Sequence, residues 1–208
     1  MTAREIILEL ATHRLTQRGI RAITMDDIAR EAGVSKRTIY ENFHDKTDLL
    51  RGVLAFMNDQ FCRQRDMVTD ESENTIEHIF RLMKLGISAM NQINPLFFED
   101  LKKYHLKLWK EVHNVNIETQ RAQIFEILKK GIKQELFRKE VNVEVVATIL
   151  MQQLSLLSDK GVFPEEKFPR QMLLETVLIS FFRGVATSKG IELIEQFLKR
   201  DADFFVTA

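Results

Sequence analysis

Apolar residues recur along this chain at intervals of three and four positions, the spacing of one face of an α-helix. Near the start, this spacing places Ile7, Leu10 and Arg14 on one helix, and Gly19 marks its expected end. Alternating apolar and polar runs next to turn signals, which would predict strands, are not evident in the sequence. With only 8 Gly and 3 Pro in 208 residues, the pattern predicts an all-α protein.

Short helices follow one another closely in the next part of the sequence. We expect Thr24 to cap a second helix that runs to about Ala32. Ser35 is expected to cap a third helix, and Asp45 to cap a fourth that continues to about Val68. After these, longer stretches at helical spacing predict further helices over residues 76–90, from 95 onward, 106–137, 143–158, 171–187 and 190–200.

Residues 25–43, MDDIAREAGVSKRTIYENF, carry the most specific motif in the chain. Two short helices that cross tightly need a small residue where they touch, which fits Ala29. They also need a turn that tolerates a left-handed backbone, which fits Gly33. In the third helix Ile39 and Phe43 share one face, which leaves the opposite face free to enter a major groove. We therefore predict a three-helix helix-turn-helix DNA-binding domain over residues 1–48.

From residue 11 to residue 50 the sequence closely resembles the tetracycline-repressor (TetR) family of bacterial regulators. That family has a first helix ending in Gly, a Thr opening the second helix, then I-A-x-x-A-G-V-S and T-[LI]-Y-x-x-F-x-x-K-x-x-L. The matching residues here are Gly19, Thr24, Ile28 to Ser35, Thr38-Ile39-Tyr40, Phe43, Lys46 and Leu49. The resemblance implies that residues 49–208 form a larger helical domain for ligand binding and dimerisation.

The resemblance also implies which side chains contact DNA. Positions that typically hold DNA phosphates are occupied by Thr24, Ser35, Thr38, Tyr40 and Lys46. The candidates for contacts with base edges are Lys36, Arg37 and Glu41. Arg can bridge guanine O6 and N7, and Glu can accept from cytosine N4. Many family members carry Gly where Arg37 stands. The resemblance therefore does not assign Arg37 a contact with bases, and we infer that contact from the chemistry of its guanidinium.

Charge and composition limit the other functions that the chain can have. Lys and Arg together number 30, as do Asp and Glu, and the first fifty residues hold eight of each sign. We therefore expect DNA binding to depend on individual contacts from well-positioned side chains rather than on a net positive charge of the domain. The single cysteine, Cys62, fits a reducing cytoplasm, and no apolar run approaches the ~20 residues of a membrane span. We find no nucleophile paired with a base and no metal-ligand spacing, so we expect no enzyme activity, cofactor or metal.

Two features of the larger domain suggest sites there. Residues 171–187 are apolar around most of the helix, which indicates burial on more than one side. The family's last two long helices form its dimer interface, so Leu178 and Phe182 are the candidates for a homodimer contact. An aromatic cluster, which either lines a ligand pocket or belongs to the core, comprises Phe97, Phe98, Tyr104 and Trp109.

The function expected from these features is a transcriptional repressor. It would be released from an inverted-repeat operator in double-stranded DNA by an unknown small apolar or amphipathic inducer. An alternative is a DNA-bound structural adaptor that recruits a protein partner without a small-molecule inducer. A third is an enzyme or carrier with a vestigial DNA-binding domain.

Overall fold

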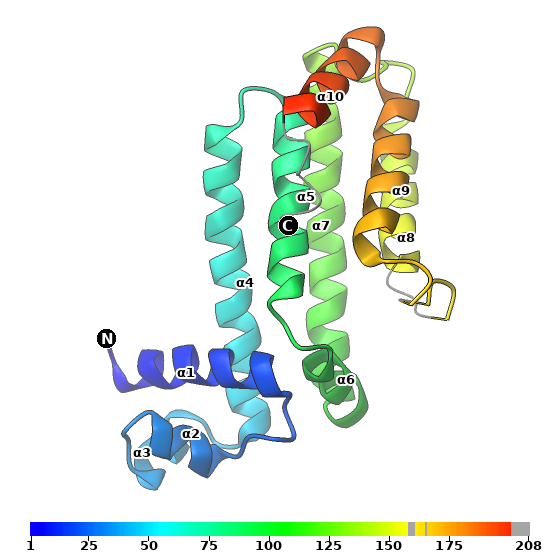
Figure 1. Cartoon of the computed structure of the whole chain (residues 1–208). Coiled ribbons are helices and arrows are strands. Elements are labelled where there is room, and N and C mark those ends of the chain that lie inside the picture. The colour runs from blue at the N-terminus through cyan, green and yellow to red at the C-terminus, as the bar shows by residue number, and fades with distance from the viewer. Residues whose placement is uncertain (158–160, 165, 201–208) are drawn as a thin grey trace. The chain divides into compact units, whose positions relative to one another are not determined.

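The computed structural model describes residues 1–157, 161–164 and 166–200, without the side chains of residues 113–116, 170 and 171. Every regular element in this part of the chain is an α-helix, as predicted (Figure 1). The helices are α1 (Ala3–Arg18), α2 (Met25–Glu31), α3 (Lys36–Asn42), α4 (Lys46–Glu71), α5 (Thr75–Asn91), α6 (Pro95–Tyr104), α7 (Leu106–Lys133), α8 (Val143–Leu156), α9 (Arg170–Val185) and α10 (Ser188–Arg200). None of these described helices is both long enough and apolar enough to cross a membrane.

The helices form two packing units. Unit 1 comprises residues 1–67 and 87–116, and unit 2 comprises residues 68–86 and the described part of 117–208. Helices α4, α5 and α7 therefore contribute residues to both units. Unit 1 extends past residue 48, where we placed the domain boundary, and the boundary as a functional division stays a prediction.

The core of unit 1 joins the first helices to α6. Buried residues of α1 and α4, such as Leu15 and Leu50, share one apolar cluster with Phe97 and Leu101 of α6. The side-chain amide of Asn94, which caps α6, also donates a hydrogen bond to the carbonyl oxygen of Gln17 at 3.0 Å. Helix α6 is thus packed directly on the end of α1 (Figure 1).

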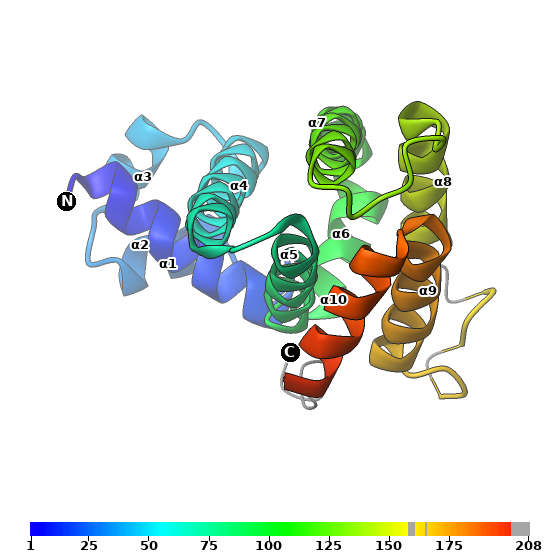
Figure 2. The ribbon, with the colours of Figure 1, turned by 90° about the horizontal axis from the view of Figure 1, so that it is seen from above.

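In unit 2 the α7–α8 and α9–α10 connections are hydrogen-bonded to each other. The N–H of Arg138 donates to the carbonyl of Val185, and the N–H of Thr187 donates to that of Leu136, both at 3.0 Å. A Cβ at Gly190 would lie 2.1 Å from the Leu136 carbonyl oxygen, so only glycine fits there. Helices α8 and α9 lie side by side in both views (Figures 1 and 2).

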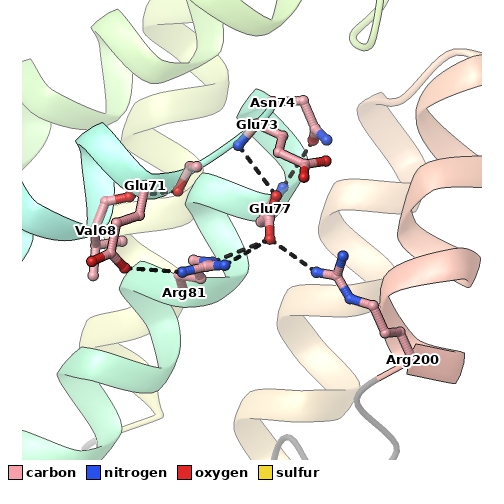
Figure 3. A network of polar contacts seen from close by, with 8 residues as sticks. Val68, Glu71, Glu73, Asn74, Glu77, Arg81 and Arg200 are labelled. Carbon is pink, nitrogen blue, oxygen red and sulfur yellow. Dashed lines mark hydrogen bonds and ion pairs between the residues drawn. The ribbon is translucent and has the colours of Figure 1, made fainter.

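A polar network ties the end of α4, the start of α5 and the end of α10 together within unit 2 (Figure 3). Its centre is the buried carboxylate of Glu77, which accepts hydrogen bonds from Arg81 at 3.0 Å and from Arg200 at 2.9 Å. Arg81 also donates to Glu71 at 3.3 Å. Burial alone would raise the pKa of Glu77, but the bonds from Arg200 and Arg81 lower it overall, so Glu77 is ionised at neutral pH.

The predicted end of the long helix at Phe137 is wrong, because α7 ends at Lys133. Glu135 adopts a φ of +59°, and the N–H of Leu136 turns back to the Gly131 carbonyl at 2.9 Å. This turn brings the Phe137 ring onto Gly131, where a Cβ would lie 2.3 Å from a ring carbon. Tertiary packing, which helical spacing does not report, therefore sets the end of the helix.

Candidate nucleic-acid interface

Helix α2 begins in a capping box. The hydroxyl of Thr24 accepts from the Asp27 N–H at 3.1 Å, and the Asp27 carboxylate accepts from the Thr24 N–H at 3.0 Å. The side-chain hydrogen bond from Thr24, then the backbone one, lower the pKa of Asp27. The cap predicted at Thr24 is confirmed. Asp27 was expected only to favour the helix dipole, and its bond back to Thr24 was missed, although the Thr-x-x-Asp spacing signals a capping box of this kind.

The turn between α2 and α3 has the predicted geometry. Gly33 adopts a φ of +67°, and the N–H of Val34 donates to the Ala29 carbonyl at 3.0 Å. Ser35 caps α3, accepting from the Thr38 N–H at 3.0 Å, and the two hydroxyls lie 2.8 Å apart. The helix-turn-helix is therefore closed by local hydrogen bonds.

Helix α3 has one buried and one open face. Ile39 is fully buried, whereas Tyr40 is 47% exposed and the Arg37 side chain is 88% exposed. The Arg37 Nε donates to the Glu41 carboxylate at 2.7 Å, one helical turn away. Two of the residues predicted to contact base edges thus lie together on the open face, and the Glu41 carboxylate orients the Arg37 guanidinium.

Lys36 pairs with Asp26 of α2, ten residues earlier in the sequence. The hydrogen bond and the charge of Asp26 raise the pKa of the Lys36 ammonium. This partner was not foreseen, because no sequence spacing links residues on two helices that cross. The pair brings a negative charge close to the predicted DNA surface.

Lys46 points into the protein. Its ammonium donates to the backbone carbonyls of Ile20 and Ile23, which closes the loop between α1 and α2. Burial lowers the pKa of Lys46, against the opposing charges of Asp100 and Asp27. Two of its three N–H donors are taken, so the predicted phosphate contact has at most one left.

Comparison with known proteins identifies this arrangement. The profile of the family described as "Bacterial regulatory proteins, tetR family" matches residues 7–53, which comprise most of α1, all of α2 and α3, and the start of α4. The chain belongs to the tetR family. It is therefore a DNA-binding transcriptional regulator, and its helix-turn-helix is the part that this family uses on DNA.

Similarity to known regulators extends well beyond the helix-turn-helix. The uncharacterized HTH-type transcriptional regulator YvaF of Bacillus subtilis is 24% identical over 179 residues, which cover 86% of this chain and 93% of YvaF. The HTH-type transcriptional repressor KstR2 of Mycobacterium tuberculosis is 29% identical over 162 residues, covering 67% of this chain and 72% of KstR2. A transcriptional regulator from Cytophaga hutchinsonii shares the fold with a TM-score of 0.71 at 18% identity, over 88% of this chain and 98% of the other.

The aromatic cluster of this tetR-family chain lies in unit 1. Phe97 is fully buried, and Phe98 packs edge-on between Phe97 and Trp109 with ring centroids 5.3 and 6.4 Å away. Tyr104 is 46% exposed and its hydroxyl accepts from Arg21 at 3.1 Å. These contacts join α6 and α7 to the core under the DNA-binding helices. A ligand contact by the four residues stays a prediction.

The side chains predicted to face a partner subunit are buried within the chain itself. Leu178 is 3% and Phe182 is 4% exposed, and the Phe182 ring stacks on Phe137 at 6.1 Å. Packing inside unit 2 covers both side chains in the single chain, and their part in a homodimer contact stays a prediction. The exposed apolar residues of the same pair of helices are Val145, Ile149, Leu156 and Met172.

Proposed function

We propose that this regulator is a repressor that acts in the cytoplasm as a homodimer on an inverted-repeat operator. A small apolar or amphipathic ligand then releases it from the DNA. The name of its relative KstR2, a transcriptional repressor, supports repression over activation. Helix α3 enters the major groove, and the second subunit places its own α3 on the other half of the operator.

The observation that carries this proposal is the division of α3 into two faces. Its inner face is sealed by Ile39, while Arg37, Tyr40 and Glu41 are exposed on the outside. An exposed arginine held by a carboxylate one turn away presents its remaining N–H groups as a fork, the geometry that matches guanine O6 and N7. The helix is thus suited to read bases.

Dimerisation is supported by the exposed apolar face of α8. Val145, Ile149 and Leu156 lie at offsets of four and eleven residues, which places them on one side of the helix. Each is about half exposed in the single chain. Two recognition helices are needed because one reads only a few base pairs, too few for useful specificity in a genome.

Ligand response is supported by the composition of α5 in unit 2. Leu82, Met83 and Leu85 are only half-buried, and a Cβ at Gly86 would meet no atom within 4 Å. A helix that is apolar on so many sides and incompletely covered offers surface that an apolar ligand can bury.

The test is to enrich a duplex from a random library on the wild-type protein and to titrate it with variants. We expect an inverted repeat, on which Arg37→Ala costs about 1–3 kcal/mol and relaxes the preference at one base pair of each half-site. Tyr40→Phe should weaken binding to all DNA sequences alike, since it removes a phosphate contact. Arg121→Ala, which removes an exposed pair with Glu118, is the matched control and should bind normally. An Arg37→Ala protein with unchanged affinity and preference would contradict base reading by α3.

A further inference from the structure

The turn between α6 and α7 is strongly basic, in a chain whose charges balance overall. Residues 102–110, which we call the basic turn, contain four lysines and no acidic residue, whereas the whole chain has 30 residues of each sign. The four are Lys102, Lys103, Lys107 and Lys110, and all are exposed. None of the motifs analysed above accounts for this concentration of charge.

The fold directs these lysines outward from unit 1. Leu101, just before the turn, and Leu108, within it, are buried in the core of the unit. The Lys102 ammonium lies 4.9 Å from the centroid of the Trp109 ring and that of Lys103 lies 5.4 Å from the centroid of the Tyr104 ring. Aromatic rings hold these two ammonium groups without neutralising their charge.

Helix stability explains only half of the cluster. Lys102 and Lys103 are in the last turn of α6, where positive charge is favourable to the helix dipole. Lys107 and Lys110 are near the start of α7, where positive charge is unfavourable. Neither forms an ion pair with a described side chain, since the nearby acids Glu111 and Glu118 pair with Arg51 and Arg121.

The basic turn contacts two segments that lie next in sequence to predicted DNA contacts. On one side, Arg21 donates to the Tyr104 hydroxyl at 3.1 Å, three residues before the cap at Thr24. On the other, the His105 Nδ1 lies 3.3 Å from the Thr47 hydroxyl, next to Lys46 at the start of α4. The turn therefore contacts residues three positions before Thr24 and one position after Lys46, two residues predicted to meet phosphates.

We propose that the basic turn binds the phosphate backbone of operator DNA beside the recognition helix. This inference rests on the proposed function. Lys46 is turned inward onto two carbonyls, so the edge of the surface that it would have served needs another source of positive charge. Lysines that neutralise phosphates release condensed counterions, and they add affinity without reading sequence.

The test compares two full-length variants that lose the same charge. The first changes the four lysines of the basic turn to Gln. The second is the matched control, in which four exposed lysines of unit 2 are changed to Gln: Lys129, Lys133, Lys139 and Lys199. Affinity is measured over a series of salt concentrations on two duplexes, one enriched on the wild-type protein and one a scrambled sequence of the same composition.

We expect the basic-turn variant to bind both duplexes more weakly, with a shallower dependence on salt. Removing one lysine–phosphate interaction should reduce the slope of log K against log salt by roughly 0.9, so a two-fold dimer should show a reduction of about 2 or more. Affinity at low salt should fall about tenfold or more, and the deficit should shrink as salt is raised. Changing the four lysines to Arg should restore the slope, and the control variant should match the wild type.

Other results would overturn the inference. If the wild type binds its enriched duplex and the basic-turn variant has the same slope as the control, the inference is wrong while the proposed function stands. If the wild type enriches no duplex at all, the proposed function itself fails. If the basic-turn variant keeps the salt dependence of its DNA affinity but loses binding to vesicles of anionic phospholipid, the turn belongs to a lipid-binding surface instead. Should circular dichroism show that the fourfold variant is misfolded, Lys107→Gln with Lys110→Gln decides the same question.

Discussion

At the scale of single residues, two glycines with open space around them play opposite parts. A Cβ would meet no atom within 4 Å at Gly33 or at Gly86. Gly33 adopts a φ of +67°, whereas Gly86 lies inside the helix α5. Because an added Cβ would meet no neighbouring atom at either glycine, the backbone conformation alone should decide how a substitution affects stability.

We therefore expect Gly33→Ala to destabilise the protein by about 1–2 kcal/mol, the cost of a left-handed conformation for an L-residue. Gly86→Ala should stabilise it by about 0.5–1 kcal/mol, because alanine loses less entropy than glycine in a helix. Chemical denaturation of both variants measures these differences. Equal stability of Gly33→Ala and wild type would mean that the turn does not hold a left-handed residue.

Single residues of the DNA surface were predicted with uneven success. Helical periodicity was enough to place Arg37 and Glu41 opposite Ile39, because spacing fixes the face of a helix. It could not place the ends of long side chains. The inward turn of Lys46 and the pairing of Lys36 with Asp26 depend on which loop and which helix lie within reach.

At the scale of elements, Arg81 and Glu77 together join three helices of unit 2. The Arg81 guanidinium binds Glu77 of its own helix and Glu71 of α4, and Arg200 of α10 reaches the same Glu77 oxygen (Figure 3). Because Glu77 is buried, losing a donor there leaves a carboxylate with fewer partners away from water. The network should thus matter more than an exposed ion pair.

We expect Arg81→Ala to lower the free energy of unfolding by about 1–3 kcal/mol, the value of hydrogen bonds to a buried charge. Lys129→Ala removes an exposed pair with Glu126 on α7 and should change it by less than about 0.5 kcal/mol. Thermal and urea denaturation of the two variants provide the comparison. Equal losses in the two would show that the network contributes no more than a surface pair.

At the scale of the whole molecule, assembly should depend on exposed rather than on buried apolar residues. We expect Ile149→Asp, on the open face of α8, to yield folded monomers that bind operator DNA far more weakly. Phe182→Asp should instead unfold unit 2, since its ring is buried within the chain. Met67→Asp, an exposed position on α4, is the control and should remain dimeric. Light scattering and circular dichroism separate these outcomes, and a dimeric Ile149→Asp protein would exclude this face as the interface.

The stability of the whole chain should also depend on pH through two histidines. Burial, and then the charge of Lys130 or Lys46, lowers the pKa of His78 and of His105 from the ordinary value of 6.5. Between the lowered values and 6.5 the unfolded chain binds more protons than the folded one, so stability rises with pH through that window. Stability should therefore fall as the pH drops below about 6.5.

Replacing both histidines by Gln should flatten this part of the profile of unfolding free energy against pH. A further loss of stability should remain at still lower pH. There Glu77, whose pKa is lowered from its ordinary value of 4.5, takes up a proton in the folded chain. An unchanged profile in the double variant would assign the dependence near pH 6 to other groups.

The sequence by itself determined the helical class, the helix-turn-helix and its caps. These features depend on short-range rules: the spacing of apolar residues, a hydroxyl at a helix start, and a glycine at a left-handed turn. Thr24, Gly33 and Ser35 each act within three or four residues of themselves. The family's pattern could therefore be recognised before any tertiary structure was known.

Only the tertiary structure decided what long-range packing controls. It placed Phe97 in the core under the DNA-binding helices, buried Leu178 and Phe182 inside unit 2, and ended α7 at Lys133. An apolar residue has the same appearance in the sequence whether it faces a core, a ligand or a partner, because the hydrophobic effect is not directional. Which surface covers it depends on contacts between residues far apart in the chain, and these arise only when the helices pack.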